Sequence, residues 1–362
     1  MRVVFRADAS IQIGSGHIMR CLTLADALAA RGIDCHFICR EHPGHLLDAI
    51  RHKGFAVHVL PRAETGDEAS SKPLAHADWL GSSQDQDAAE CRRMLAELRP
   101  DWLVVDHYAL DARWEGQLKP CSGKLMVIDD LADREHQCDL LLDQTLGRRA
   151  DDYRALVPAD SRILCGSNFA LLRPEFAAWR QAGLERRKQA RLRRLLVNLG
   201  GVDKDNVTAR VLAALSLCEL PADLRITVVM GATAPHLEQV RRVAQSMPWS
   251  TEVLVGVSNM AELMVASDLA IGAAGATSWE RCCLGLPGIL IVLADNQKQV
   301  ALGLQQAGAV ALVATDSSFS QALEDALRRL QESPELLAAM ASSAADIVDG
   351  QGIARVIQQL EL

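Results

Sequence analysis

A buried strand, a glycine-containing turn and the start of a helix follow one another at the beginning of the chain. This order constrains the fold more than any other feature. Residues 1–6 are mostly apolar, as in a buried strand, and residues 18–30 carry apolar side chains at helical spacing. Such strands and helices alternate as far as residue 314, and glycine turns follow strands again near residues 200 and 275. The alternation predicts two α/β halves built on parallel sheets.

The first glycine turn brings a histidine to the start of a helix. Gly14 and Gly16 permit positive φ angles and a close approach of the backbone to a ligand. The first turn of the helix offers unpaired N–H groups to an anion, so His17 is well placed for proton transfer beside a phosphate. The turn matches neither the dinucleotide-binding fingerprint nor the P-loop, and a glycine pair there can also serve packing alone.

Polar residues follow two apolar strands in the first half. An Asp-His-Tyr sequence, residues 106–108, ends one strand, and two aspartates, residues 129–130, end another. The carboxyl ends of strands in open parallel sheets face the ligand crevice, so these side chains are candidate site residues together with His17. Paired acids can bind a metal, but for residues 129–130 we favour a structural role as helix caps or solvent-facing groups.

The second half contains a turn suited to a diphosphate. Residues 272–276 are all small, and a helix begins near Thr277, so a pyrophosphate could approach the helix start. Glu280 then falls in the first helical turn, where its carboxylate could bind ribose hydroxyls. Thr277 and Glu280 could instead form a capping box, and both roles are compatible. The amides Asn296 and Gln297 follow another strand and face the same crevice.

The charge balance excludes one class of partner. In a chain of 362 residues, 46 Asp and Glu outnumber 38 Lys and Arg, and the formal net charge is −8. This argues against nucleic acid as a partner, and the basic residues 185–194 are interpreted as a solvated helix face or an interdomain hinge. No apolar run reaches membrane-spanning length and no leader segment is evident, so we expect no membrane partner and a cytoplasmic location.

The ten cysteines are scattered along the chain, and several lie in apolar runs, so reduced and buried thiols are expected. The densest group of potential metal ligands is Cys35, His36, Cys39, His42 and His45. Its spacing fits no standard zinc site. We favour a strand whose alternate residues face the core, followed by a polar loop, and expect no metal.

Several motifs together resemble the UDP-sugar hydrolases of the pseudaminic acid pathway. The resemblance covers residues 1–314. It rests on residues 5–10 (FRADAS), 13–17 (IGSGH), 105–108 (VDHY), 169–173 (FALLR), 200–203 (GGVD) and 296–297 (NQ). The opening motif is the most specific of these. The loop at residues 61–86 and the helical tail after residue 314 are longer than in the shortest members of the family.

The resemblance implies a GT-B-like fold, in which two Rossmann-type parallel-sheet domains face a cleft. The family is similar to the GT-B glycosyltransferases, especially the transferase that adds N-acetylglucosamine to the lipid-linked peptidoglycan precursor. We expect a first domain at residues 1–172 with the catalytic histidine, a linker at 173–190 and a UDP-binding domain at 191–345. Residues 346–362 are expected to form a C-terminal helix that packs back on the first domain, in a monomer or weak oligomer.

The resemblance also implies roles for individual residues. His17 matches the catalytic base and Tyr108 a tyrosine at the reacting centre, whereas Arg20 of the same motif has no assigned role. The residues expected to bind the UDP-sugar substrate are Gly14, Gly16, Asp106, Gly200, Gly201, Asn206, Gly275, Thr277, Glu280, Asn296 and Gln297. Of these, Glu280 would bind the ribose.

The implied reaction is hydrolysis of UDP-2,4-diacetamido-2,4,6-trideoxy-β-L-altropyranose. Water deprotonated by His17 would attack the anomeric carbon on the face opposite UDP and release 2,4-diacetamido-2,4,6-trideoxy-L-altrose with inversion. Helix N-termini and amides can hold the diphosphate, so no metal or other cofactor is required. A GT-B glycosyltransferase, a UDP-sugar 2-epimerase and a non-catalytic nucleotide-sugar sensor remain alternatives.

Overall fold

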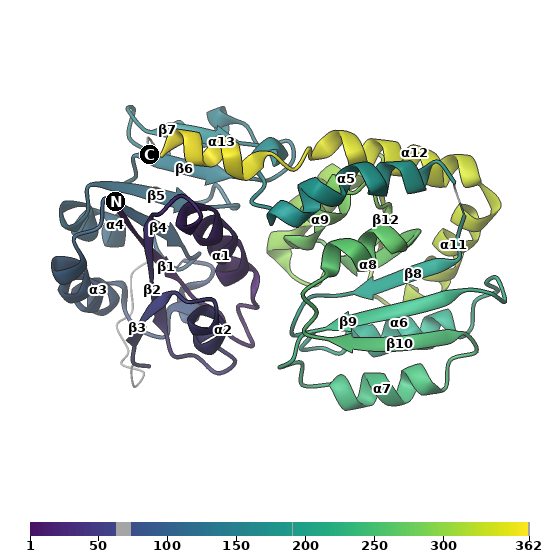
Figure 1. Cartoon of the computed structure of the whole chain (residues 1–362). Helices are drawn as coiled ribbons and strands as arrows, with labels where there is room; N and C mark the ends of the chain where they lie inside the picture. Colours follow the sequence, from purple (N-terminus) through teal and green to yellow (C-terminus); the bar gives the residue numbers. More distant parts are fainter. Residues whose placement is uncertain (63–73, 190, 361–362) are drawn as a thin grey trace. The chain divides into compact units, whose positions relative to one another are not determined.

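The computed structural model describes residues 1–62, 74–189 and 191–360, and it divides into two compact units. The first unit comprises Met1–Leu171 and Gly352–Leu362, and the second comprises Leu172–Gln351. Each contains one sheet of parallel strands with helices packed against it (Figure 1). The expected α/β class with two Rossmann-like units is confirmed.

The sheet of the first unit has seven parallel strands in the order β3-β2-β1-β4-β5-β6-β7. They are β1 (Arg2–Ala7), β2 (Asp34–Arg40), β3 (Ala56–Leu60), β4 (Trp102–Asp106), β5 (Lys124–Ile128), β6 (Leu140–Asp143) and β7 (Arg162–Cys165). Phe5 of β1 is in register with Phe37 of β2 and Val104 of β4, and all three are buried. Helices cover both faces of such a sheet, which accounts for the continuous apolar runs of β4, β5 and β6.

The helices of the first unit follow the strands. They are α1 (Gly16–Ala29), α2 (Leu47–His52), α3 (Gln84–Leu98), α4 (Ala112–Leu118) and α13 (Gly352–Gln359), with the short 3₁₀ helices η1 (Ala77–Leu80), η2 (Lys119–Cys121), η3 (Ala150–Asp152) and η4 (Ser167–Phe169). The 3₁₀ helix η1 lies within the loop expected at residues 61–86. The rest of that expected loop includes residues 63–73, which lie outside the described residues.

The last helix belongs to the first unit, although the whole second unit separates it from β7 in sequence. Val356, Ile357 and Leu360 are buried in the core that also contains Phe5. The indole N–H of Trp102 donates to the carbonyl oxygen of Leu360 at 3.2 Å. The end of the chain therefore completes the hydrophobic core formed by its beginning.

The second unit has six parallel strands in the order β10-β9-β8-β11-β12-β13. They are β8 (Arg194–Asn198), β9 (Arg225–Met230), β10 (Ser250–Val255), β11 (Leu269–Ala273), β12 (Gly288–Ile291) and β13 (Val310–Val313). The helices are α5 (Pro174–Arg187), α6 (Val207–Leu215), α7 (Leu237–Gln245), α8 (Met260–Ala266), α9 (Thr277–Cys283), α10 (Lys298–Gln306), α11 (Phe319–Glu332) and α12 (Pro334–Ile347), with the 3₁₀ helix η5 (Asp295–Gln297).

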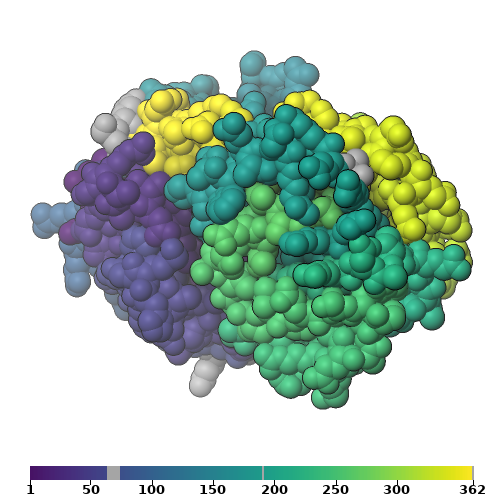
Figure 2. Space-filling model, turned by 45° about the vertical axis from the view of Figure 1, so that its right-hand side comes forward, coloured from purple at the N-terminus to yellow at the C-terminus, as the bar shows by residue number. Residues whose placement is uncertain are grey.

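Residues 173–190, expected to be a linker, mostly form α5 of the second unit. Pro174 starts the helix, where its missing N–H removes no intrahelical hydrogen bond, and Phe176 is fully buried. The helix packs on α8, α9 and α12, and the teal atoms of this region cover part of the green second unit in Figure 2. The sequence did not predict this helix, because its C-terminal end is strongly charged and few of its residues are buried.

Within the described residues, no helix combines the length and the apolar character that crossing a bilayer requires.

Candidate active site

Both sheets contain a point at which the strand order reverses. In the first unit it lies between β1 and β4, and in the second between β8 and β11. Ligands of open parallel sheets bind at the carboxyl ends of the strands beside such a reversal. The predicted residues of the first unit gather after β1 and β4, and the glycine turns of the second unit follow β8 and β11. Each unit therefore brings its predicted residues to the expected end of its sheet.

His17 lies in the first turn of α1 and pairs with a carboxylate at the end of β4. His17 Nδ1 is 2.5 Å from Asp106 Oδ1, and both side chains are buried. An ionised carboxylate only accepts hydrogen bonds, so we assign the proton to Nδ1, which leaves Nε2 as the basic nitrogen. Nε2 has no hydrogen-bond partner among the described residues. This is the arrangement of a histidine base that a carboxylate orients.

Arg20 holds the same carboxylate from one turn further along α1. Its Nε and one terminal nitrogen donate to the two oxygens of Asp106 at 2.6 and 2.7 Å. Its other terminal nitrogen donates to Asp130 at 2.5 Å. Burial alone would raise the pKa of Asp106, but the charge of Arg20 and the hydrogen bonds from Arg20 and His17 hold that pKa well below its usual range. Asp106 is therefore ionised at neutral pH.

Tyr108 lies against the imidazole. Its ring meets that of His17 edge-on, with centroids 4.5 Å apart, and its hydroxyl donates to Asp130 at 2.9 Å. Burial and the nearby charge of Asp130 raise the pKa of Tyr108 well above its ordinary value. The phenol thus stays protonated and can position a ligand, but it is a poor base.

The two aspartates after β5 have different environments. Asp129 has a structural role, but it is fully buried and caps no helix, unlike the two forms of that role expected from the sequence. It accepts the loop N–H groups of Leu131 and Ala132 and pairs with Arg134 at 2.8 Å. Asp130 instead joins the Arg20 network described above. No group of three or more His, Cys, Asp and Glu side chains in residues 1–62, 74–189 and 191–360 is arranged to hold a metal ion.

Two further features of the first unit were singled out in the sequence. Gly14 has a φ of +82°, which requires glycine, whereas Gly16 starts α1 without a positive φ. In the suspected zinc sequence, Cys35 and Cys39 face the core on the same side of β2 as Phe37. This alternation matches the favoured strand interpretation.

The glycine turn after β8 is closed by its own aspartate. Gly200 has a φ of +100°, and the carboxylate of Asp203 accepts the N–H groups of Val207 and Thr208 at 2.9 and 2.8 Å. These are amides of the first turn of α6, so this helix start already has an anionic cap. Asn206, a predicted ligand residue, precedes α6, and its side-chain oxygen is buried without a hydrogen-bond partner within the described chain.

The end of β11 is tightly packed at Gly272, whereas the turn that follows it is open at Gly275. A Cβ on Gly272 would lie 2.4 Å from a terminal nitrogen of Arg281, whereas one on Gly275 would meet nothing within 4 Å. The alternative capping box of Thr277 and Glu280 is not formed, because α9 begins at Thr277 and its N-cap is Ala276.

Two charged side chains of α9 surround this turn. Arg281 is buried and donates to the carbonyl of Ala273 at 2.8 Å and the hydroxyl of Ser278 at 2.9 Å, and burial lowers its pKa to about 10. Burial raises the pKa of Glu280 to about 7, against the charge of Arg173 3.6 Å away. The cation behind the turn favours an anion in front of it.

The two amides after β12 lie in η5. The side-chain oxygen of Gln297 accepts the N–H of Leu293 at 3.0 Å, so this oxygen holds its own loop. Asn296 is half-buried. The donor group of Gln297 and the whole amide of Asn296 are the atoms that fit the predicted ligand role.

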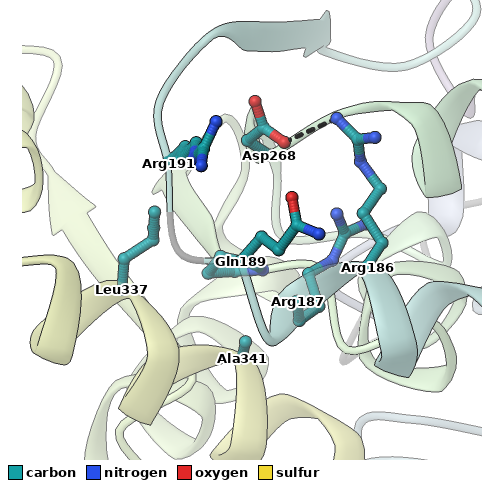
Figure 3. Close-up of a pocket in the computed structure, with 8 residues that line it drawn as sticks. Arg186, Arg187, Gln189, Arg191, Asp268, Leu337 and Ala341 are labelled. Carbon is teal, nitrogen blue, oxygen red and sulfur yellow. Dashed lines mark hydrogen bonds and ion pairs between the residues drawn. The ribbon is translucent and has the colours of Figure 1, made fainter.

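A hollow with about 210 Å³ of empty space, partly open to solvent, lies elsewhere in the second unit. Arg186, Arg187, Asp268 and Pro287 line it, at the amino ends of β11 and β12, away from the predicted site (Figure 3). Arg187 is buried and donates to the carbonyls of Met264 and Ser267 at the end of α8. The basic stretch was interpreted as solvated or a hinge, but this arginine anchors a helix instead.

Sequence reasoning missed two parts of the first site. Arg20 could have been found, because it lies three residues after His17 and so on the same side of the helix. Trp79 of η1, whose ring lies 6.5 Å from that of His17, carried no signal, because it stands in an aperiodic segment.

Comparisons with known proteins agree with the fold of the two units. Residues 195–360 match the glycosyltransferase family 28 C-terminal domain. The chain is 28% identical to the UDP-2,4-diacetamido-2,4,6-trideoxy-β-L-altropyranose hydrolase of Campylobacter jejuni, over 85% of this chain and 97% of that protein. The crystal structure of MurG from Acinetobacter baumannii superimposes with a TM-score of 0.71 at 16% identity and covers 99% of each chain. The chain has the GT-B fold, and its second half resembles the glycosyltransferase family 28 C-terminal domain.

A shorter match involves a transferase. The UDP-N-acetylglucosamine--N-acetylmuramyl-(pentapeptide) pyrophosphoryl-undecaprenol N-acetylglucosamine transferase of Caulobacter vibrioides is 34% identical over 146 residues. The match covers 38% of this chain and 40% of the transferase. The sequence similarity to the hydrolase therefore extends over much more of the chain than the sequence similarity to this transferase.

Proposed function

We propose that this GT-B protein hydrolyses UDP-2,4-diacetamido-2,4,6-trideoxy-β-L-altropyranose to UDP and 2,4-diacetamido-2,4,6-trideoxy-L-altrose, a step of pseudaminic acid biosynthesis. The observation that carries the proposal is the buried pair of His17 and Asp106, which forms a base for a small nucleophile. The 28% identity to a hydrolase of this substrate, over 85% of the chain, supports it.

In the proposed reaction the first unit activates water. Nε2 of His17 takes a proton from the water as its oxygen bonds to the anomeric carbon, and Asp106 stabilises the imidazolium that forms. Arg20 keeps Asp106 ionised and fixed, and protonated Tyr108 positions the sugar. General-base catalysis of this kind contributes typically ~10²–10⁴-fold to the rate.

The second unit would bind the nucleotide and the departing charge. As the bond between the anomeric carbon and the phosphate oxygen breaks, its electron pair goes to UDP, so negative charge grows on the diphosphate. The start of α9 and the buried cation of Arg281 favour that charge at Gly275 and Thr277. The turn at Gly200 and Gly201 and the amide of Asn296 would complete the nucleotide site, with Glu280 on the ribose.

The test is proton NMR of the protein with the UDP-sugar, in the absence of an acceptor and in the presence of EDTA. We expect UDP and a free sugar that first appears with inverted anomeric configuration. His17→Asn should lower kcat by about 10²–10⁴-fold and leave the Kd for UDP nearly unchanged, because its ring serves only the proton transfer. Unchanged turnover in this variant would remove His17 from the proposed role.

A glycosyltransferase is the second candidate, favoured by the 34% identity to the Caulobacter transferase. A transferase would leave the UDP-sugar intact until an acceptor hydroxyl is supplied. An epimerase would change the configuration at C2, whereas the hydrolase leaves it unaltered. The same NMR spectra therefore separate the three activities.

A further inference from the structure

An aromatic wall stands beside the proposed base and takes no part in the proton transfer described above. It consists of His76, Trp79 and Tyr108. The ring of Trp79 is stacked on that of Tyr108, with centroids 5.8 Å apart at an angle of 28°. His76 lies 4.3 Å from Trp79 and 5.5 Å from Tyr108. All three rings therefore lie within one cluster at His17.

Trp79 differs from the other tryptophans of the first unit. Trp102 and Trp114 are buried, and their indole N–H groups donate to Leu360 and Asp87. Trp79 is only half-buried, and its indole N–H has no acceptor within the described residues. A tryptophan held for packing alone is expected to satisfy this donor when buried. Trp79 instead keeps an indole donor that no described residue uses, on a ring that lies beside those of His17 and Tyr108.

The position of Trp79 is fixed from its C-terminal side. Leu80 is buried in the core of the first unit. Gly81 has a φ of +64°, and a Cβ there would lie 2.8 Å from the ring of His42, so only glycine lets the chain pass so close. The backbone N–H of Trp79 donates to the carbonyl of His76, and this hydrogen bond closes the turn. The indole therefore stands on a supported segment.

The surroundings of His17 combine two kinds of surface. Asp130 and Arg20 provide charged hydrogen-bonding groups, and the aromatic wall provides apolar rings. Binding sites for small molecules typically pair a mostly apolar lining with a few placed polar groups. A hexose that lacks a hydroxyl and carries acylated amines has the matching chemistry, since its methyl and C–H groups are apolar and its amide oxygens accept hydrogen bonds.

We propose that Trp79 and His76 form a sugar subsite beside His17, which takes the apolar face of a deoxy, N-acylated hexose and offers the indole N–H to an amide oxygen. The proposal rests on the proposed function and adds a basis for selectivity. A methyl group at C6 packs against the wall, whereas a hydroxymethyl group brings a hydroxyl that the apolar face leaves without a partner.

The kinetic test compares two UDP-sugars in the full-length protein. Trp79→Ala should lower kcat/KM for UDP-2,4-diacetamido-2,4,6-trideoxy-β-L-altropyranose by roughly 10–100-fold and reduce its preference over UDP-N-acetylglucosamine by about tenfold. Trp79→Phe keeps a ring face and should retain most of the preference. Trp179→Phe, a substitution of a tryptophan that is 37% exposed on α5, is the matched control and should change neither value.

A second measurement does not depend on turnover. The chain has six tryptophans, so six indole N–H signals are expected in a ¹⁵N NMR spectrum, and Trp79→Phe identifies one by its loss. Free 2,4-diacetamido-2,4,6-trideoxy-L-altrose should shift that signal and leave the signal of Trp179 unchanged. This readout also covers the case in which Trp79→Ala fails to fold.

The outcomes separate the two proposals. A shifted Trp79 signal without hydrolysis by the wild type keeps the subsite and rejects the hydrolase. Hydrolysis with an unshifted signal, or a Trp79→Phe or Trp79→Ala variant that slows both UDP-sugars equally at unchanged KM, rejects the subsite and leaves Trp79 as a cover over His17.

Discussion

At the scale of single residues, Arg20 shows why the site could be predicted only in part. The strand and turn patterns predicted that His17 and Asp106 would lie at one edge of a sheet, and they do. No pattern predicts that one guanidinium bridges Asp106 and Asp130, because this depends on where two strand ends meet in space. The roles assigned to these residues in binding and catalysis remain predictions.

Replacement of Arg20 by methionine tests this bridge. Two carboxylates would lose their cation in a buried site, which should lower the free energy of unfolding by about 3–5 kcal/mol. The pKa of Asp106 is depressed in the folded protein, so its ionisation stabilises the fold above pH ~4 and this contribution is lost as the pH falls. In Arg20→Met the pKa of Asp106 in the folded protein should rise, so the further loss of stability on acidification should be smaller than in the wild type. Urea unfolding from pH 3 to 7 measures both effects.

The control for this variant is Arg113→Met. Arg113 also pairs with an aspartate, but its side chain is 57% exposed. Exposed ion pairs contribute about 0–1 kcal/mol, so the control should remain near the wild type. Equal losses in the two variants would contradict a special role for the bridge.

Glu280 predicts a pH dependence of nucleotide binding. Burial raises its pKa to about 7, so the carboxylate is mostly neutral at pH 6 and mostly ionised at pH 8. Ribose hydroxyls donate more strongly to the ionised form, and we expect the Kd for a UDP-sugar to fall roughly five- to tenfold across this interval. A UDP-sugar is the better ligand for calorimetry, because its diphosphate does not titrate near pH 7. Glu280→Gln should abolish the dependence, and its persistence would assign it to another group.

At the scale of elements, the spacing and burial of apolar side chains explain which helices and strands could be predicted. Strands such as β4, β5 and β12 carry continuous apolar runs, and α1 carries Leu24 and Leu28 on its buried side, so their patterns are clear. Three helices, α4, α5 and α8, were not predicted. The buried residues of α5 are Phe176, Gly183 and Arg187, and the last is a charged residue that pattern reasoning assigns to the surface.

Arg187 predicts how α5 is held on α8. Its guanidinium is buried against the carbonyls of Met264 and Ser267, and Arg187→Met would leave these oxygens without that donor. The expected loss in the free energy of unfolding is about 1–3 kcal/mol. Lys188→Met is the matched control, because Lys188 is 71% exposed on the next position and should change stability by less than about 0.5 kcal/mol. Thermal and urea unfolding compare them, and a neutral Arg187→Met would mean that water replaces the guanidinium.

At the scale of the whole molecule, the chain returns to its first unit after completing the second. The alternation of strands and helices alone assigns each half its own core, whereas the family resemblance implied a C-terminal helix that packs back on the first domain. Val356, Ile357 and Leu360 lie in the core of Phe5 and Trp102. The GT-B chain therefore does not consist of two successive sequence halves. The core of the first unit therefore includes α13, although this helix follows the strands of the second unit in the sequence.

Deletion of residues 352–362 tests whether the first unit depends on this helix. The first unit would lose three buried side chains, each worth about 1.5–3 kcal/mol, together with the hydrogen bond from Trp102 to Leu360. Hydrogen exchange should therefore show a large loss of protection in β1 and β4, while β8 and β11 keep theirs, because the core of the second unit is unchanged. Val356→Ala should produce a smaller loss in the same strands, and Gln358→Ala, at an exposed position of the same helix, should produce none. If both sheets lost protection equally, the two units would unfold as one, and the C-terminal helix would stabilise the protein as a whole instead of the first core.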